Sequence, residues 1–114
     1  MAIWSFSSSA LTGSYRHGGF SARAVLSPLS IYVEVSGGTA YRDTEELVSD
    51  TSLLLRDGSI LPAVDLIFGF TGGGSHNTED EYLSSADFTS QFQDLLDVSQ
   101  VAAVQVGDIQ IPLE

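Results

Sequence analysis

The chain has 114 residues, the length of one ordinary domain, and its 43% hydrophobic and 17% charged residues favour a packed globule over a disordered chain. Fifteen acidic residues are opposed by four arginines and no lysine, which gives a net charge of -11 and opposes binding to nucleic acid or to anionic lipid surfaces. The absence of cysteine excludes disulfides, zinc-thiolate sites and a cysteine nucleophile.

The start of the chain, MAIWSFSSSALTGSY, has neither a basic region nor a continuous apolar region, so it does not resemble a signal peptide. No apolar run approaches the ~20 residues that a membrane-spanning helix needs, and we expect no direct membrane insertion by this segment. Two settings follow: a cytoplasmic protein, or a domain taken from a longer exported chain.

The first half of the chain contains several predicted strands. Residues 2–6 (AIWSF) are counted as the first. Residues 20–26 (FSARAVL) and 31–35 (IYVEV) follow, and each of these two segments has an apolar residue at every second position. Pro28 interrupts the short connection SPLS, so the chain is expected to turn or to change sheets there.

A hairpin is predicted in LLLRDGSIL, because Asp57 and Gly58 tolerate the positive φ angles of a type I′ turn. Residues 63–70 (AVDLIFGF) are apolar enough to predict a central strand covered on both faces. Residues 71–86 (TGGGSHNTEDEYLSSA) are expected to form a flexible glycine-rich and acidic loop, which is long for a connection inside a compact domain.

The region around Phe88 and Phe92 fits either a helical face, with Leu95, or a strand. The surrounding β pattern favours a strand over residues 88–93 and a turn over residues 94–100.

The last segment, VQVGDIQIPLE, is the clearest hairpin of the sequence. A two-residue loop at Gly107 and Asp108 pairs Val106 with Ile109 and Val104 with Ile111, with Gln105 and Gln110 on the opposite side. Pro112 cannot donate to a ladder, so its strand is expected to end there or to lie at a sheet edge. With seven or eight short strands and no convincing helix, the sequence predicts a single all-β domain over residues 1–114, an immunoglobulin-like β-sandwich of antiparallel strands.

Few residues are candidates for chemistry. His17 and His76 lie in glycine-containing loops without a nucleophile motif, so we expect neither to be catalytic. The triple glycine Gly72 to Gly74 lacks the Lys-Ser/Thr ending of a phosphate-binding loop, and a flexible linker is the better interpretation.

Two acidic clusters could supply oxygen ligands to calcium. Neither matches the spacing of a calcium-binding loop, so solvated acidic loops are favoured and no metal or cofactor is predicted. The clusters are Asp43, Glu45 and Glu46, and Glu79, Asp80 and Glu81.

Aromatic residues could line a sugar-binding face, because they supply flat amphipathic contact area. Tyr32 is the most interesting, since it falls on the polar side of an amphipathic strand, where it could equally cover a sheet edge or form a cross-strand pair. The full set is Trp4, Tyr15, Tyr32, Tyr41 and Tyr82.

The order of AVLSPLSIYVEV, LRDGS and LLDVSQVAAVQVGDIQIPLE, over about two thirds of the chain, resembles the extracytoplasmic domains of unknown function of bacterial membrane-anchored proteins related to anti-sigma factors. The matching positions are Ser27 and Pro28, Asp57 and Gly58, Asp97, Ser99 and Val101, and Gly107 with Ile111 to Leu113. Such proteins carry an N-terminal membrane span, so the resemblance implies an excised domain whose final hairpin is structural.

The expected function is therefore a non-enzymatic, extracytoplasmic domain of a bacterial surface or membrane protein, with a recognition, sensing or scaffold role and an unknown protein or glycan as ligand. A carbohydrate-binding module and a self-assembling virion or structural protein are the alternatives. Nucleic acid is not an expected partner, and the oligomeric state stays open.

Overall fold

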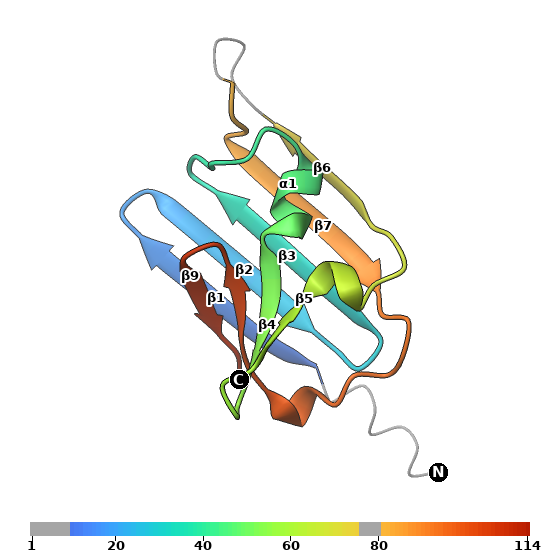
Figure 1. The fold of residues 1–114 in the computed structure, drawn as a ribbon. Coiled ribbons are helices and arrows are strands. Elements are labelled where there is room, and N and C mark those ends of the chain that lie inside the picture. The colour runs from blue at the N-terminus through green and yellow to red at the C-terminus, as the bar shows by residue number, and fades with distance from the viewer. Residues whose placement is uncertain (1–9, 76–80) are drawn as a thin grey trace.

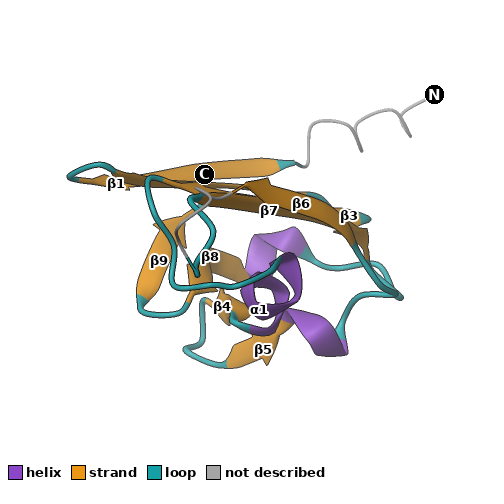
Figure 2. Ribbon diagram, turned by 90° about the horizontal axis from the view of Figure 1, so that it is seen from above, coloured by secondary structure: helices purple, strands orange, loops and turns teal. Residues whose placement is uncertain are grey.

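The computed structural model describes residues 10–75 and 81–114 and has two antiparallel β-sheets packed face to face (Figures 1 and 2). The predicted all-β sandwich is confirmed. Sheet A has five strands, in the spatial order β1 (Leu11–His17), β2 (Phe20–Leu26), β3 (Ser30–Ser36), β7 (Ser85–Gln91) and β6 (Thr71–Ser75). Sheet B has four strands, in the order β5 (Ile60–Pro62), β4 (Thr51–Leu55), β8 (Val101–Val106) and β9 (Ile109–Pro112).

The strands β2 and β3 form as the alternation predicts. Their register pairs Ala24 with Val33 and Leu26 with Ile31, and all four side chains are buried in the core. The connection is the expected turn, in which the backbone N–H of Ser27 donates to the carbonyl of Ser30 at 2.9 Å.

The closing hairpin is also confirmed. Val106 pairs with Ile109 and Val104 with Ile111, and Gly107 has a φ of 60° whereas Asp108 has a negative φ, the pattern of a type II′ turn. The chain then reaches across to sheet A, because the backbone N–H and C=O of Glu114 both bond to Thr12 of β1, at 3.0 and 3.2 Å.

The second predicted hairpin exists as β4 and β5, but its turn is not type I′. Only Gly58 has a positive φ, 92°, and its N–H donates to the carbonyl of Leu55 at 3.0 Å, so the loop is a type I turn followed by a glycine. The Asp57 carboxylate explains the difference, because it accepts the N–H of Ser59 at 2.9 Å and thereby holds a local Asx turn.

Residues 63–70 are not the central strand that their apolar character predicts. The short 3₁₀ helix η2 (Ala63–Asp65) opens the segment, Ile67 makes an isolated bridge to Phe92, and the side chain of Phe68 is 74% exposed. Asp65 interrupts the apolar run, so of these residues only Ala63 and Ile67 are buried, while Leu66 packs partly buried against the core.

A helix that the sequence analysis did not predict, α1 (Thr44–Ser49), precedes β4. The Asp43 carboxylate caps it by accepting the N–H of Glu46 at 3.0 Å, and the Glu46 carboxylate accepts the N–H of Arg42 at 2.7 Å. Asp-x-x-Glu before an apolar pair is a helix-start signal. None of the helices in the described residues is long and apolar enough to cross a membrane.

The expected loop over residues 71–86 is shorter than predicted, because β6 and the start of β7 occupy its two ends. Thr71 pairs with Thr89 and Ser75 with Ser85. The glycines permit this pairing, since a Cβ added at Gly72 would lie 2.3 Å from the carbonyl oxygen of Asp87. The predicted strand over residues 88–93 is confirmed as β7, which begins earlier, at Ser85. The strand predicted over residues 2–6 and the loop residues 76–80 lie outside the described residues.

The short 3₁₀ helix η3 (Val98–Gln100) lies in the predicted turn and leads into β8.

The core lies between the sheets, with Phe88 the largest of its fully buried side chains. Sheet B does not cover the whole inner face of sheet A. Strand β9 contacts β1 and β2, whereas α1 contacts β7 and β6, as the view from above shows (Figure 2).

Gly13 in β1 allows β9 to approach sheet A. A Cβ added there would lie 2.0 Å from the carbonyl oxygen of Pro112, whereas one added at Gly73, in the opposite edge strand, would meet no atom within 4 Å. We therefore expect Gly13→Ala to lower the free energy of unfolding by about 1–3 kcal/mol, and Gly73→Ala to change it by less than about 0.5 kcal/mol. Urea unfolding of both variants measures this, and equal effects would contradict the close packing of β9 against β1.

Candidate functional site

The outer face of sheet A, which points away from sheet B, carries polar side chains in register on neighbouring strands. The register places polar residues side by side on neighbouring strands, so that Arg23 lies opposite Glu34, and Glu34 opposite Asp87. In the same way Ser21 lies opposite Ser36, and Tyr32 opposite Thr89.

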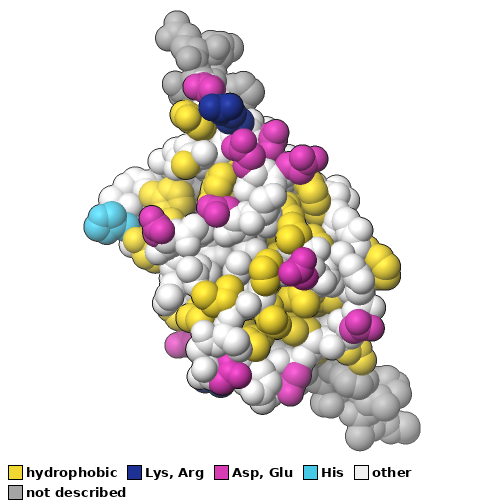
Figure 3. Space-filling view, in the orientation of Figure 1, with side chains coloured by type: hydrophobic (Ala, Val, Ile, Leu, Met, Phe, Trp, Pro, Cys, Tyr) yellow, Lys and Arg dark blue, Asp and Glu magenta, His cyan; other side chains and the backbone are white. Residues whose placement is uncertain are grey.

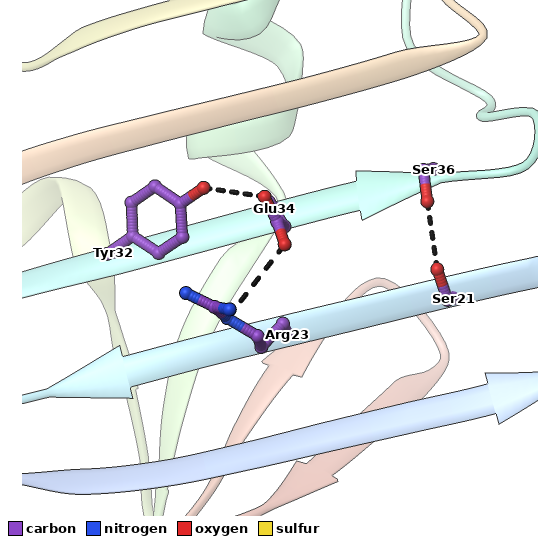
Figure 4. A network of polar contacts seen from close by, with 5 residues as sticks. All are labelled: Ser21, Arg23, Tyr32, Glu34 and Ser36. Carbon is purple, nitrogen blue, oxygen red and sulfur yellow. Dashed lines mark hydrogen bonds and ion pairs between the residues drawn. The ribbon is translucent and has the colours of Figure 1, made fainter.

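Three of these side chains form a network on β2 and β3 (Figure 4). The Tyr32 hydroxyl donates to Oε2 of Glu34 at 2.6 Å, and Nε of Arg23 lies 3.8 Å from Oε1 of the same carboxylate. The Arg23 guanidinium carbon lies 5.7 Å from the centroid of the Tyr32 ring. The carboxylate of Glu34 thus joins a cation and an aromatic hydroxyl on adjacent strands.

The network is partly exposed. The side chains of Arg23 and Glu34 are 56% and 42% exposed, and Tyr32 beside them is half-buried. Beside it, the hydroxyls of Ser21 and Ser36 bond to each other at 2.8 Å. A hollow of about 230 Å³ adjoins the network over β1 and β2, with Ser14 and Arg16 among its lining residues.

The Tyr32 hydroxyl is held in its protonated form. Its hydrogen bond to Glu34, followed by burial and by the negative charges of Glu34 and Asp87, raises the pKa of Tyr32 to about 12, against a smaller opposing effect of Arg23. The face therefore offers an aromatic ring, a guanidinium, hydroxyls and two carboxylates, which suits hydrogen bonding to a polar ligand rather than proton transfer near neutral pH.

The histidines and acidic clusters singled out in the sequence do not come together. His17 lies exposed at the end of β1, and His76 lies outside the described residues. Asp43 and Glu46 cap α1. Glu81 pairs with Arg42 at 3.1 Å, whereas Glu79 and Asp80 are not described. Across residues 10–75 and 81–114, no group of three such side chains could hold a metal ion.

The aromatic residues are dispersed as well. Tyr15 packs on the core and meets Phe20 edge to face, with the ring centroids 6.3 Å apart. The Tyr41 hydroxyl donates to Asp50 at 2.6 Å, and burial, followed by that bond, raises the pKa of Tyr41 well above its ordinary value. Tyr82 lies beside Arg42, 5.8 Å from the ring centroid to the guanidinium carbon. Of the predicted set, Tyr32 alone is described on the outer face of sheet A, and Trp4 is not described.

Sequence analysis missed Arg23, Glu34 and Asp87 as neighbours of Tyr32. Arg23 and Glu34 could have been found, because counting back from the turn at Ser27–Ser30 pairs them directly. Asp87 could not, since its strand is far along the chain and its register depends on tertiary packing.

No family model, curated protein or solved structure matches this chain.

The titration of Tyr32 tests the network. Because the pKa of about 12 exceeds the ordinary value of about 10, the contribution of Tyr32 to stability is complete below pH ~10 and is lost as the pH rises through the folded value. We expect NMR of ¹³C-labelled tyrosine to give Tyr32 a midpoint near 12, and Glu34→Gln to move it toward about 10.

Glu45→Gln is the matched control for this titration, because Glu45 lies on α1, away from the outer face. The control should leave the Tyr32 midpoint in place. A midpoint near about 10 in the unmodified protein would contradict the hydrogen bond between Tyr32 and Glu34.

Proposed function

We propose that this protein is a non-enzymatic recognition domain that binds its ligand on the outer face of sheet A. The proposal rests on one network, in which the Glu34 carboxylate lies 2.6 Å from the Tyr32 hydroxyl and 3.8 Å from Nε of Arg23. It lies on β2 and β3, strands that have neighbours on both sides. Strands paired on both sides hold their side chains in fixed directions, so a ligand meets a surface that needs little ordering on binding.

The contacts among these groups support binding rather than catalysis. The hydroxyls of Ser21 and Ser36 bond to each other, and the Tyr32 hydroxyl is committed to Glu34. Tyr32 has the geometry of a hydroxyl beside a carboxylate base, but an activated nucleophile gives up its proton near neutral pH. The pKa of Tyr32 is instead raised to about 12, so this hydroxyl is suited to donating a hydrogen bond.

We propose a neutral or cationic glycan as the ligand class. A flat aromatic ring beside hydrogen-bonding side chains offers apolar contact to the C–H face of a sugar and polar contact to its hydroxyls. Glu34 and Asp87 lie on this face with Arg23, and the chain has a net charge of -11. Polyanionic glycans would be repelled by that charge.

We further propose that the domain acts at the bacterial cell surface. The support is the resemblance of its SP turn, DG hairpin and closing hairpin to extracytoplasmic domains related to anti-sigma factors. A membrane-spanning segment or a signal peptide upstream in the same reading frame is the expected genomic finding, and a native start at Met1 would contradict this location.

Retention of the protein in gels that contain polysaccharides tests the ligand class. We expect at least one gel from a panel of neutral polysaccharides and chitosan to retard the protein. Tyr32→Ala should weaken that affinity by about tenfold, which corresponds to ~1.4 kcal/mol, because it removes the ring and one side of the network.

Tyr82→Ala is the matched control, since Tyr82 is an exposed tyrosine that, like Tyr32, lies beside an arginine, Arg42. It should leave retention unchanged, with both variants checked for folding by urea unfolding. Equal losses in the two variants, or no retention by any polysaccharide of the panel, would overturn the glycan proposal.

A further inference from the structure

Strand β6 lies at one of the two edges of sheet A, and its outer side is open. Within the described residues, β6 pairs only with β7, and all five of its residues, Thr71 to Ser75, are exposed. Edge strands usually carry lysine, proline, an inward charge or a bulge that blocks further pairing. The TGGGS sequence of β6 has none of the blocking side chains, and no other strand of residues 10–75 and 81–114 pairs with its outer edge, so another extended chain could pair there.

An apolar groove adjoins this edge. It has a volume of about 190 Å³ and lies between α1 and the segment that leads into β6, with Val48, Val64, Ile67, Phe68 and Phe70 as its apolar lining. The side chains of Phe68 and Val64 are 74% and 48% exposed. Figure 3 shows hydrophobic side chains gathered on this side of the molecule, where Figure 1 places α1 and η2, with acidic side chains around them.

The edge and the groove form one continuous surface. Phe70 immediately precedes β6, and its ring meets Phe88 of β7 edge to face, with the centroids 6.3 Å apart. The inward positions of β6 are Gly72 and Gly74, which pair with the buried Phe88 and Ala86. A strand added to β6 would send alternate side chains to this same inner side, beside Phe70 and toward the groove.

We propose that the β6 edge and this groove bind an extended segment of a partner protein by strand addition, a segment whose apolar side chains alternate with basic ones. Backbone hydrogen bonds to β6 would supply affinity, and the apolar side chains that enter the groove would supply specificity. This site is separate from the outer face, so the two proposals stand or fall independently.

The negative charge of the chain favours a basic partner at this site. The groove is bordered by Glu45 of α1, and the chain has a net charge of -11 and no lysine. A second copy of the chain would bring the same negative charge to the interface, whereas a basic segment is attracted to it. A basic and apolar extended peptide therefore fits this surface better than self-association does.

A synthetic nine-residue peptide that alternates lysine with valine, with one central phenylalanine, is the probe. In ¹⁵N NMR titrations of the full chain, we expect shifts concentrated in residues 64–75 and weaker binding as salt increases. Replacing lysine by glutamate, or methylating alternate backbone nitrogens on the edge that faces β6, should reduce the affinity at least tenfold.

Phe68→Ser should also reduce the affinity at least fivefold. Leu95→Ser is its control, because Leu95 is comparably exposed, at 76%, but does not line the groove. No binding of the lysine peptide, equal affinity after N-methylation, or equal effects of the two substitutions would overturn the proposal. A doubling of mass with protein concentration, accompanied by shifts in β6 without peptide, would show that the edge pairs with a second copy instead.

Discussion

The apolar inner face of a five-stranded sheet has to be covered by a smaller sheet of four strands, and this constraint shapes the whole molecule. Strand β9 contacts sheet A at β1 and β2, where Gly13 makes room for the carbonyl of Pro112. At the other side the cover is α1, which contacts β7 and β6 and buries Leu47 and Val48. Beside α1, the side chains of Val64, Phe68 and Phe70 stay exposed, so apolar surface remains open at the β6 side of the sandwich.

The same constraint explains why the opposite face of sheet A can be polar. The inner residues of β2 and β3 supply the packing, and alternate residues along a strand point to opposite faces. The outward residues therefore lie outside the core between the sheets, and cross-strand contacts such as Arg23 with Glu34 help to arrange them. Each partly exposed ion pair of this kind adds little to stability.

Sequence patterns predicted the parts of the fold that depend on local alternation and turn residues. Strands β2 and β3 and the hairpin at Gly107 form as expected, because period-two burial and a short turn fix a hairpin without distant information. Residues 63–70 and β6 did not follow their patterns. An apolar run does not say whether a neighbouring strand exists, and Gly72 to Gly74 show no alternation, since their pairing comes entirely from β7. Likewise, the position of Tyr32 on the polar side was predictable, whereas its proximity to Asp87 required the register between β3 and β7.

The glycines of β6 show how packing and surface chemistry separate within one strand. A Cβ at Gly72 would lie 2.7 Å from Cγ2 of Thr44 as well as 2.3 Å from the carbonyl of Asp87, so the packing of α1 and β7 requires glycine there. Gly73 faces the other way and has open space around it, so packing does not require glycine at this position. The bare backbone at Gly73 is therefore not a by-product of core packing. Its effect is on the surface, where this outward position of the edge strand carries no charged or bulky side chain of the kind that discourages pairing with another strand.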